Sequence, residues 1–373
     1  MERYQKKQIL KDLSAKMVFL VGPRQVGKTW LAKQIAETYS HPLYLNYDDL
    51  DNRKIIEQRS WRSTVNLIVF DELHKMKEWK SYLKGVWDTR NENMKIIITG
   101  SARLDFMKTA GDALSGRFFT HRLLPFSVKE IGAHPYPSAV DRLMIRGGFP
   151  EPFLADDEVF HARWRQNYVD GLIRQDILDF ERVHAFRSMQ TLVQLLRKRV
   201  GTPVSYASLA RDLALSPVTV ARYIEILEAL YIVFRVTPHH RNVGRSLLKE
   251  PKIYFFDTGL VTAGEGEQFE NMVAVSLLKA VYGRNDCLGE QCSLRYLRTK
   301  DGKEVDFAVV RDDEPELYVE AKVTDASTHR GLSSFCELHR VPGVQAVADL
   351  RNERTEGRVE IRKAESWLGE LFM

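Results

Sequence analysis

Short, unbroken runs of apolar residues recur through the first 125 residues and predict buried β-strands. Met17–Val21, Val65–Phe70 and Lys95–Thr99 are such runs, and Leu43–Asn46 is a fourth. Their apolar residues do not alternate with polar ones, which is typical of parallel strands covered by helices on both faces. Because Trp30–Tyr39, between two of these runs, has a helical pattern, the segment predicts an open α/β sheet.

The loop after the first strand carries a phosphate-binding pattern. Gly22–Thr29 fits G-x-x-x-x-G-K-[ST], with a predicted strand before it and a predicted helix after it. Glycines allow backbone N–H groups to wrap phosphates, and the helix N-terminus adds a favourable field. We expect Lys28 to contact the β- and γ-phosphates of ATP, and Thr29 to bind Mg²⁺. The candidate nucleotide-binding residues are Gly22, Pro23, Arg24, Gln25, Val26, Gly27, Lys28, Thr29 and Trp30.

Two carboxylates follow the apolar run that ends at Phe70. We expect Asp71 to hold Mg²⁺ and Glu72 to act as the base that polarises the attacking water. An acidic turn after a strand is the alternative, and the phosphate loop upstream makes it the weaker one.

Three more residues are candidates for ATP hydrolysis. Thr99 and Ser101 lie at the C-terminal end of a predicted strand, where open α/β sheets bind ligands, and either could contact the γ-phosphate or its water. Arg117 is the candidate arginine finger, a group often supplied by a neighbouring subunit. Turn-forming residues and an ordinary surface arginine remain the alternatives.

Five motifs follow one another along the chain, and their order resembles a known family. They are Gly22–Thr29, Phe70–Glu72, Thr99–Ser101, Ser115–Arg117 and Gly147–Glu151. Together they resemble the bacterial and archaeal AAA+ ATPases that carry a C-terminal DUF4143-type domain, over nearly the whole chain. The resemblance implies ATP hydrolysis at subunit interfaces of a homo-oligomeric ring or hexamer. Such proteins usually have glutamine two residues after the second carboxylate, where this chain has His74, so we assign His74 no catalytic role.

The middle of the chain predicts a helix-turn-helix. Tyr206–Ala214 has the pattern of one helix, and Ser216 and Pro217 open the next as N-cap and first helical residue. Strands over Tyr231–Val236 and Lys252–Phe256 would complete a winged helix, whose second helix enters the major groove of DNA. The DNA-binding candidates are Ser216, Thr219, Arg222, Arg241 and Arg245. A packing or subunit-contact module is the open alternative.

The C-terminal part carries a nuclease-like constellation. Glu320 and Lys322 share one face of a predicted strand, and an antiparallel hairpin would bring Asp306 beside Glu320. The carboxylates could hold Mg²⁺, Lys322 could position water, and Glu270, at the start of a predicted helix, could add a carboxylate. The pattern resembles the PD-(D/E)xK nucleases, which include Holliday-junction resolvases. Surface charges on a hairpin, or a fold kept for DNA binding alone, are the alternatives.

Composition narrows the class of protein. The net charge of +5 permits DNA binding without showing it. No run approaches the eighteen or so apolar residues of a membrane span, and the opening residues do not resemble a secretory signal. Cys287, Cys292 and Cys336 form no metal pattern, so we expect a cytoplasmic protein with free thiols and no membrane partner.

The predicted fold class is α/β, with a P-loop AAA+ parallel sheet sandwiched by helices. The expected domains are the ATPase core at 1–125, a helical lid or linker at 126–200, a winged helix-turn-helix at 201–260 and an α/β nuclease-like domain at 261–373. The leading hypothesis is an ATP- and Mg²⁺-dependent ATPase that acts on duplex or branched DNA. The alternatives are a nucleotide-gated switch that docks a protein partner, and a metal-dependent nuclease regulated by ATP.

Overall fold

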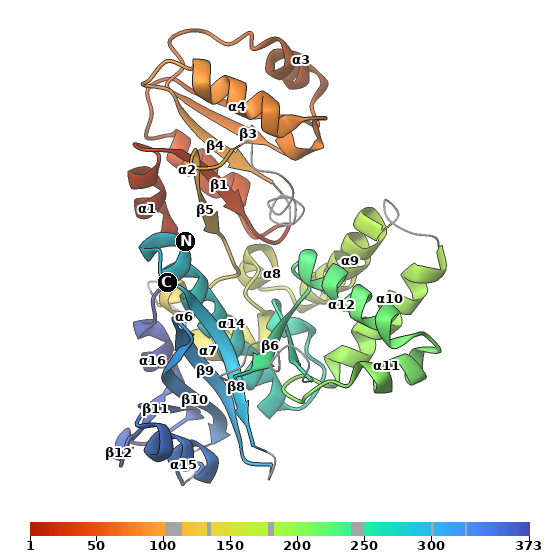
Figure 1. The fold of residues 1–373 in the computed structure, drawn as a ribbon, viewed down its shortest axis with the longest axis vertical. Coiled ribbons are helices and arrows are strands. Elements are labelled where there is room, and N and C mark those ends of the chain that lie inside the picture. The colour runs from red at the N-terminus through yellow and green to blue at the C-terminus, as the bar shows by residue number, and fades with distance from the viewer. Residues whose placement is uncertain (101–113, 133–135, 178–182, 240–249, 300–301, 325–326) are drawn as a thin grey trace. The chain divides into compact units, whose positions relative to one another are not determined.

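The computed structural model describes residues 1–100, 114–132, 136–177, 183–239, 250–299, 302–324 and 327–373. They form two compact units, Met1–Leu124 and Pro125–Met373 (Figure 1). Ser101, Arg241 and Arg245 lie outside the described residues. Among the described helices, none has the length and apolar character that crossing a lipid bilayer requires.

The first unit is built on a five-stranded parallel sheet in the order β2-β3-β4-β1-β5. Its strands are β1 (Met17–Val21), β2 (Pro42–Asn46), β3 (Leu67–Asp71), β4 (Lys95–Thr99) and β5 (Phe118–Arg122). Its helices are α1 (Gln5–Asp12), α2 (Lys28–Ala36), α3 (Leu50–Gln58), the 3₁₀ turn η1 (Leu73–Lys75) and α4 (Trp79–Thr89). The predicted α/β class with a parallel sheet is confirmed.

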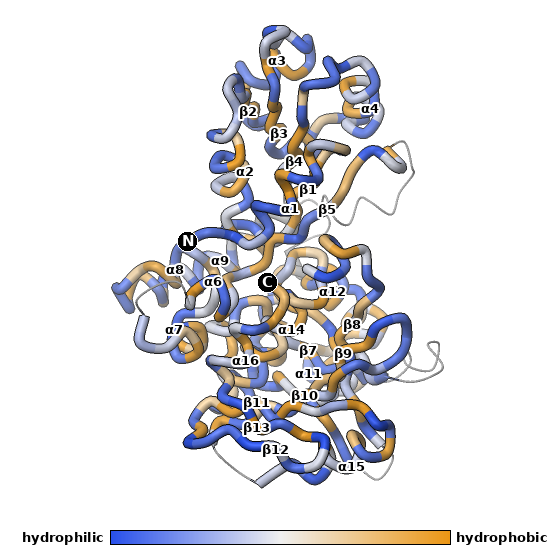
Figure 2. The backbone as a smooth tube through the Cα atoms, turned by 90° about the vertical axis from the view of Figure 1, so that its left-hand side faces the viewer, coloured by the Kyte–Doolittle hydropathy of each residue, from blue (hydrophilic) through white to orange (hydrophobic). Residues whose placement is uncertain are grey.

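The apolar runs of the sequence become the centre of this sheet. Every residue of β1 and β3 is buried, and both strands are hydrophobic over most of their length in Figure 2. The run β1 begins and ends where the sequence predicts, because a strand covered on both faces leaves an unbroken apolar signature. β5 has no such signature, since four of its five residues are only half-buried or exposed.

The second unit begins with helices. They are α6 (Val128–Ile131), α7 (Ala139–Arg146), α8 (Pro150–Leu154), α9 (Glu158–Ile177), α10 (Val183–Arg197), α11 (Tyr206–Leu213) and α12 (Pro217–Ala229). Ser216 caps α12 by accepting a hydrogen bond from the backbone of Thr219, and Pro217 is the first helical residue, as predicted.

An eight-stranded mixed sheet completes the second unit, in the order β12-β13-β11-β10-β9-β8-β6-β7. Its strands are β6 (Val233–Pro238), β7 (Lys252–Phe255), β8 (Cys292–Arg298), β9 (Glu304–Arg311), β10 (Glu314–Thr324), β11 (Gly343–Asp349), β12 (Arg354–Glu356) and β13 (Val359–Lys363). The remaining elements are the 3₁₀ turn η3 (Thr258–Leu260), α14 (Glu265–Leu288), α15 (Arg330–His339) and α16 (Ala364–Glu370).

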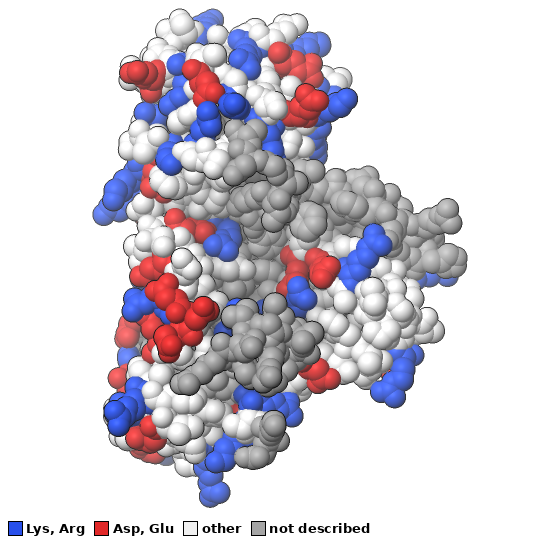
Figure 3. Space-filling model, viewed as in Figure 1, with Lys and Arg blue, Asp and Glu red and all other residues white. Residues whose placement is uncertain are grey.

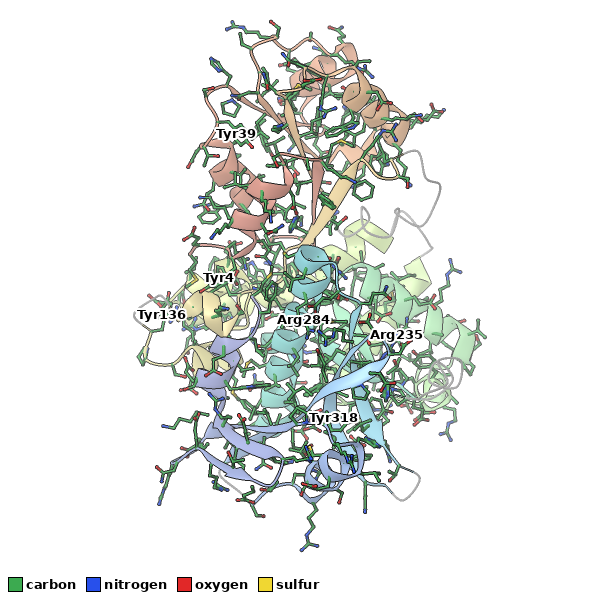
Figure 4. The ribbon with its side chains drawn as sticks, turned by 60° about the vertical axis from the view of Figure 1, so that its left-hand side comes forward. Tyr4, Tyr39, Tyr136, Arg235, Arg284 and Tyr318 are labelled. Atoms are coloured by element: carbon green, nitrogen blue, oxygen red, sulfur yellow. The ribbon has the colours of Figure 1, made fainter. Side chains whose placement is uncertain are left out.

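The long helix α14 packs against β8, β9 and β10. Near its C-terminal end, Arg284 forms ion pairs with Glu290 at 2.5 Å and with Glu316 at 2.7 Å, which join the helix to the sheet (Figure 4). Glu270 lies inside α14 and not at its start, because the helix already begins at Glu265.

The hairpin β6–β7 also differs from its expected place. The sequence assigned it to a winged helix separate from the C-terminal domain, whereas β6 pairs with β8 in parallel through Thr237 and Pro238. The hairpin is therefore the edge of the same sheet that carries β9 and β10.

Candidate functional site

The phosphate loop of the first unit connects β1 directly to α2. Gly22, Gln25 and Gly27 all have positive φ, at 140°, 60° and 98°. A Cβ on Gly22 would lie 2.1 Å from the backbone oxygen of Leu123, so only glycine fits there. Gly27 is the N-cap of α2, and the loop thus leads into the positive end of a helix.

Arg3 holds the loop from the N-terminal side. Its guanidinium donates to the backbone oxygen of Val26 at 2.5 Å and to that of Leu124 at 3.1 Å. Arg3 is buried, so these bonds lie in a region of low dielectric. Sequence reasoning missed this residue, because its partners are 23 and 121 positions away.

The side chain of Lys28 folds back onto the start of the phosphate loop. Its ammonium donates to the backbone oxygens of Gly22 at 2.9 Å and Pro23 at 2.5 Å. Burial lowers the pKa of Lys28 to about 8, although Glu72 and Asp71 act in the opposite direction. An ammonium has three donors, so a phosphate oxygen can take the third while the loop keeps the other two.

Asp71 ends β3 at the carboxyl edge of the sheet and gathers three hydroxyl groups. Thr29 donates to its Oδ2 at 3.1 Å and Tyr44 donates to the same oxygen at 2.5 Å. Thr99 donates to Oδ1 at 2.5 Å. A threonine hydroxyl and a carboxylate oxygen side by side are hard oxygen ligands, which fit Mg²⁺. The donor set therefore suits a magnesium nucleotide.

Glu72 occupies a turn immediately after β3. Its backbone is left-handed, with φ 56°, and its N–H donates to the backbone oxygen of Thr99 at 3.1 Å. Its carboxylate lies 3.3 Å from Nζ of Lys75 and 3.6 Å from Nε2 of His74. A non-glycine residue held at positive φ is typical of sites where the surrounding structure fixes a functional side chain.

The remaining ATPase candidates lie in different places. Thr99 is fully buried and directs its hydroxyl to Asp71. Trp30 projects from α2 with 47% of its surface exposed. Tyr44 and Lys75 were not predicted. Tyr44 contacts Asp71 from β2, which pairs with β3, and this pairing of strands has no local sequence signal.

Arg117 precedes β5 at the amino edge of the sheet, where its backbone oxygen bonds the N–H of Met17. Its side chain pairs with Asp88 at 3.1 Å. The strands span roughly 16 Å at about 3.3 Å per residue, so Arg117 lies far from the phosphate loop of its own chain. It is not assembled with Lys28 and Asp71 within this unit.

The second unit brings together Asp306, Glu320 and Lys322 on the antiparallel pair β9–β10. The backbone N–H of Asp306 donates to Oε2 of Glu320 at 3.3 Å, and that of Ala321 donates to Oδ2 of Asp306 at 3.1 Å. Lys322 donates to Oε1 of Glu320 at 2.8 Å, and Nδ1 of His329 lies 3.3 Å from the same oxygen.

Glu270 joins this cluster from α14, together with a residue that sequence reasoning missed. Nζ of Lys252, the first residue of β7, lies 3.2 Å from Glu270, 2.7 Å from Glu304 and 3.3 Å from Asp306. Tyr254 donates its hydroxyl to Glu270 at 2.6 Å. The only sequence signal for Lys252 is a lysine that opens an apolar strand.

The electrostatics of the cluster follow from burial and crowding. Burial raises the pKa of Glu270 and of Glu320, and the nearby charge of Asp306 raises both further. Lys252 is 1% exposed, and three carboxylates raise its pKa despite burial. Across the described part of the chain, no group of three or more histidine, cysteine or acidic side chains is arranged to hold a metal ion.

The helix pair α11–α12 presents the described DNA-binding candidates to solvent. Ser216 and Arg222 are exposed and Thr219 is half-buried. Arg235 of β6 pairs with Glu228 of α12 at 2.6 Å, which fixes the second helix on the hairpin (Figure 4). On the face in Figure 3, lysine and arginine side chains are interspersed with acidic ones.

Three families match successive parts of the chain. Residues 14–132 match the family described as AAA domain. Residues 138–269 match the domain of unknown function DUF8612, and residues 265–364 match the domain of unknown function DUF4143.

The relatives are bacterial and archaeal. The chain is 29% identical over 248 residues to an uncharacterized protein of Mycobacterium tuberculosis, Rv2008c, covering 66% of this chain and 55% of the relative. The chain thus matches about half the length of that protein. It is 22% identical to the uncharacterized protein MJ1544 of Methanocaldococcus jannaschii, covering 87% of this chain and 79% of the relative.

Among solved structures, the chain is similar to the Walker-type ATPase PABY2304 of Pyrococcus abyssi. The TM-score is 0.45 at 15% identity, covering 70% of this chain and 95% of the other. The chain therefore combines an AAA domain in its N-terminal third with a C-terminal DUF4143 domain.

Proposed function

We propose that this chain binds and hydrolyses MgATP at the phosphate loop and uses the cycle to act on duplex or branched DNA. The observation that carries the ATPase part is that the Thr29 hydroxyl donates to Asp71, while the adjacent Lys28 donates to the backbone of the phosphate loop. All three lie at the carboxyl edge of one parallel sheet, where such sheets bind ligands.

Each residue has a distinct task in this proposal. Bound Mg²⁺ supplies neutralisation of the β- and γ-phosphate charge. Thr29 and Asp71 would supply the protein oxygens that hold the metal, and Lys28 would donate its remaining N–H to a phosphate oxygen. Glu72, at the turn after β3, accepts a proton from the attacking water.

Arg117 takes part from a neighbouring subunit. Because it lies at the amino edge of its own sheet, it is free of the local phosphate site and available to the site of another copy. This arrangement requires a homo-oligomer, and a closed ring such as a hexamer supplies every site with one arginine. The pair with Asp88 is partly exposed, so exchanging it for a phosphate contact costs little.

The DNA part of the proposal rests on α11, α12 and the hairpin β6–β7. The capped N-terminal turn of α12 is exposed, as the recognition helix of a winged helix requires. Ser216 and Arg222 on that helix would contact the duplex. The nuclease-like arrangement of Asp306, Glu320 and Lys322 on β9–β10 supports a nucleic acid as the object of the cycle.

One observation favours the alternative of a nucleotide-gated switch with a protein partner. Val218, in the first turn of α12, is 79% exposed, and an exposed valine suits a protein surface better than a phosphate backbone. In that case the helix pair and the C-terminal sheet serve as docking modules.

ATPase rates separate the two proposals. The full chain is assayed without DNA and with single-stranded, duplex and four-way junction DNA, at low and high salt, with Lys28→Ala as the inactive control. The DNA proposal predicts a higher rate with duplex or junction DNA and binding that weakens steeply with salt. Unchanged turnover together with no DNA binding at low salt contradicts it and leaves the protein-partner alternative, which affinity capture of one dominant partner would support.

Assembly is tested separately. The mass of the full chain with a non-hydrolysable ATP analogue is expected to be that of a closed oligomer, and a monomer at every concentration contradicts the role given to Arg117.

A further inference from the structure

The carboxylate cluster of the second unit already contains a cation of its own. Nζ of Lys252 lies between Glu304, Glu270 and Asp306, at 2.7, 3.2 and 3.3 Å. An ammonium has three N–H donors, and here three carboxylates accept them. The side chain is 1% exposed, so water does not share these bonds.

Each oxygen of the two carboxylates Asp306 and Glu320 already accepts a hydrogen bond. Asp306 accepts from Lys252 at Oδ1 and from the backbone of Ala321 at Oδ2. Glu320 accepts from Lys322 at Oε1 and from the backbone of Asp306 at Oε2. Unlike Asp71, whose donors are neutral hydroxyl groups, these carboxylates are bonded by two ammonium groups, whose positive charge opposes a divalent cation at the same point.

The lysine and the carboxylates come from different parts of the chain. Lys252 lies in the segment 138–269 that matches one family, while Glu270, Glu304 and Asp306 lie in 265–364, which matches another. Lys252 reaches the cluster because β6 pairs with β8 and places the hairpin β6–β7 at the edge of the C-terminal sheet. Tyr254, two residues along β7, bonds Glu270 from the same hairpin.

We propose that the ammonium of Lys252 takes the place of a divalent metal in this cluster, so that the C-terminal site binds no metal while Lys252 is present. The carboxylates then serve to hold the hairpin β6–β7, and with it α12, on the C-terminal sheet. Metal-dependent cleavage of DNA is not expected at this site in the native chain. The proposed DNA binding and ATP hydrolysis do not require a metal ion at this site.

Charge balance explains why one cation is needed. Three carboxylates packed together without a counter-ion repel one another and pay a large desolvation cost. Replacing Lys252 by methionine keeps the unbranched stem but removes the charge, so the cluster gains affinity for a divalent ion. Lys252→Arg keeps a cation in place and is the matched control.

The test measures Mn²⁺ binding by titration calorimetry on the full chain without nucleotide. All proteins carry Asp71→Asn, which removes the metal carboxylate of the ATPase site. Lys252→Met is expected to bind one additional Mn²⁺ per chain and to unfold at a higher temperature when Mn²⁺ is present. Both effects are expected to disappear when Asp306→Asn is added, and to be absent in Lys252→Arg.

The wild-type cluster provides the second arm. With Lys252 present, chains with and without Asp306→Asn are expected to bind Mn²⁺ equally. Binding by the Lys252 chain that depends on Asp306 overturns the proposal, as does a folded Lys252→Met chain that gains no Mn²⁺. If Lys252→Met folds only with Mn²⁺, the proposal is supported. If it does not fold at all, the comparison of the two chains that keep Lys252, with and without Asp306→Asn, decides. None of these results depends on DNA-stimulated ATP hydrolysis.

Discussion

The hydroxyl group of Thr99 donates a hydrogen bond to Oδ1 of Asp71 at 2.5 Å, across the neighbouring strands β4 and β3. The parallel register pairs these two residues directly. Thr29 and Tyr44 donate to the other oxygen of Asp71, so three hydroxyl groups fix the orientation of the carboxylate. Thr99 thus acts as a positioning residue for the proposed metal carboxylate.

Thr99→Val should lower kcat/KM for ATP roughly tenfold, since losing one hydrogen bond to a buried charged group costs about 1–3 kcal/mol. Thr99→Ser keeps the hydroxyl and should retain most of the activity. Steady-state kinetics over a range of Mg²⁺ concentrations checks this, and the valine variant should need more Mg²⁺ for half-maximal rate. A valine variant with wild-type Mg²⁺ dependence would refute the positioning role.

Glu72→Gln should bind MgATP with nearly unchanged affinity but hydrolyse it about 10²–10⁴-fold more slowly, because the amide cannot accept the proton of the attacking water. Single-turnover measurements and a binding titration on the same preparation separate the two effects. Turnover at the wild-type rate would show that the base is another group.

Arg117→Ala should reduce ATP hydrolysis roughly 10³-fold without weakening ATP binding, if Arg117 completes the site of a neighbour. A mixing experiment tests the geometry. Arg117→Ala and Lys28→Ala are each expected to be inactive, but in a mixture some interfaces combine an intact phosphate loop with an intact arginine. Recovery of activity on mixing supports the arrangement, and an inactive mixture of correctly assembled subunits argues against it.

The pKa of Lys28, lowered by burial to about 8, predicts a pH dependence. A lysine with a lowered folded-state pKa binds fewer protons in the folded state, so its contribution to stability is lost as the pH falls through about 8. Phosphate favours the charged ammonium. Above about pH 8, MgATP binding should therefore take up a proton and weaken by up to roughly tenfold per pH unit.

Calorimetric titrations at pH 8.5, in two buffers of different ionisation enthalpy, measure this proton uptake. Binding heats that do not differ between the buffers, after correction for the titration of the nucleotide itself, would mean that Lys28 remains charged without nucleotide.

The sequence allowed the ATPase sheet to be predicted because its signals are local. The run Met17–Val21 is apolar throughout, and the glycine pattern after it fixes the loop. β5 was missed because an edge strand with half-buried residues resembles a loop. The bond between Thr99 and Asp71 depends on the strand order, which places β4 beside β3, and no local pattern contains that order.

In the C-terminal cluster, too, some residues could be grouped from the sequence and one could not. Asp306, Glu320 and Lys322 could be grouped from the period of two along neighbouring strands. Lys252 could not, because it arrives from the hairpin β6–β7, which joins this sheet through a pairing of only two residues with β8. Its 54-residue separation from Asp306 leaves no trace in the spacing of charges.

The most direct test of the account is a calorimetric titration of the full chain with MgATP, in parallel with Lys28→Ala. A site formed by Lys28, Thr29, Asp71 and Glu72 predicts saturable binding of one MgATP per chain, which the substitution abolishes. Absence of binding heat in the wild-type chain at several temperatures, or equal binding by Lys28→Ala, would contradict it.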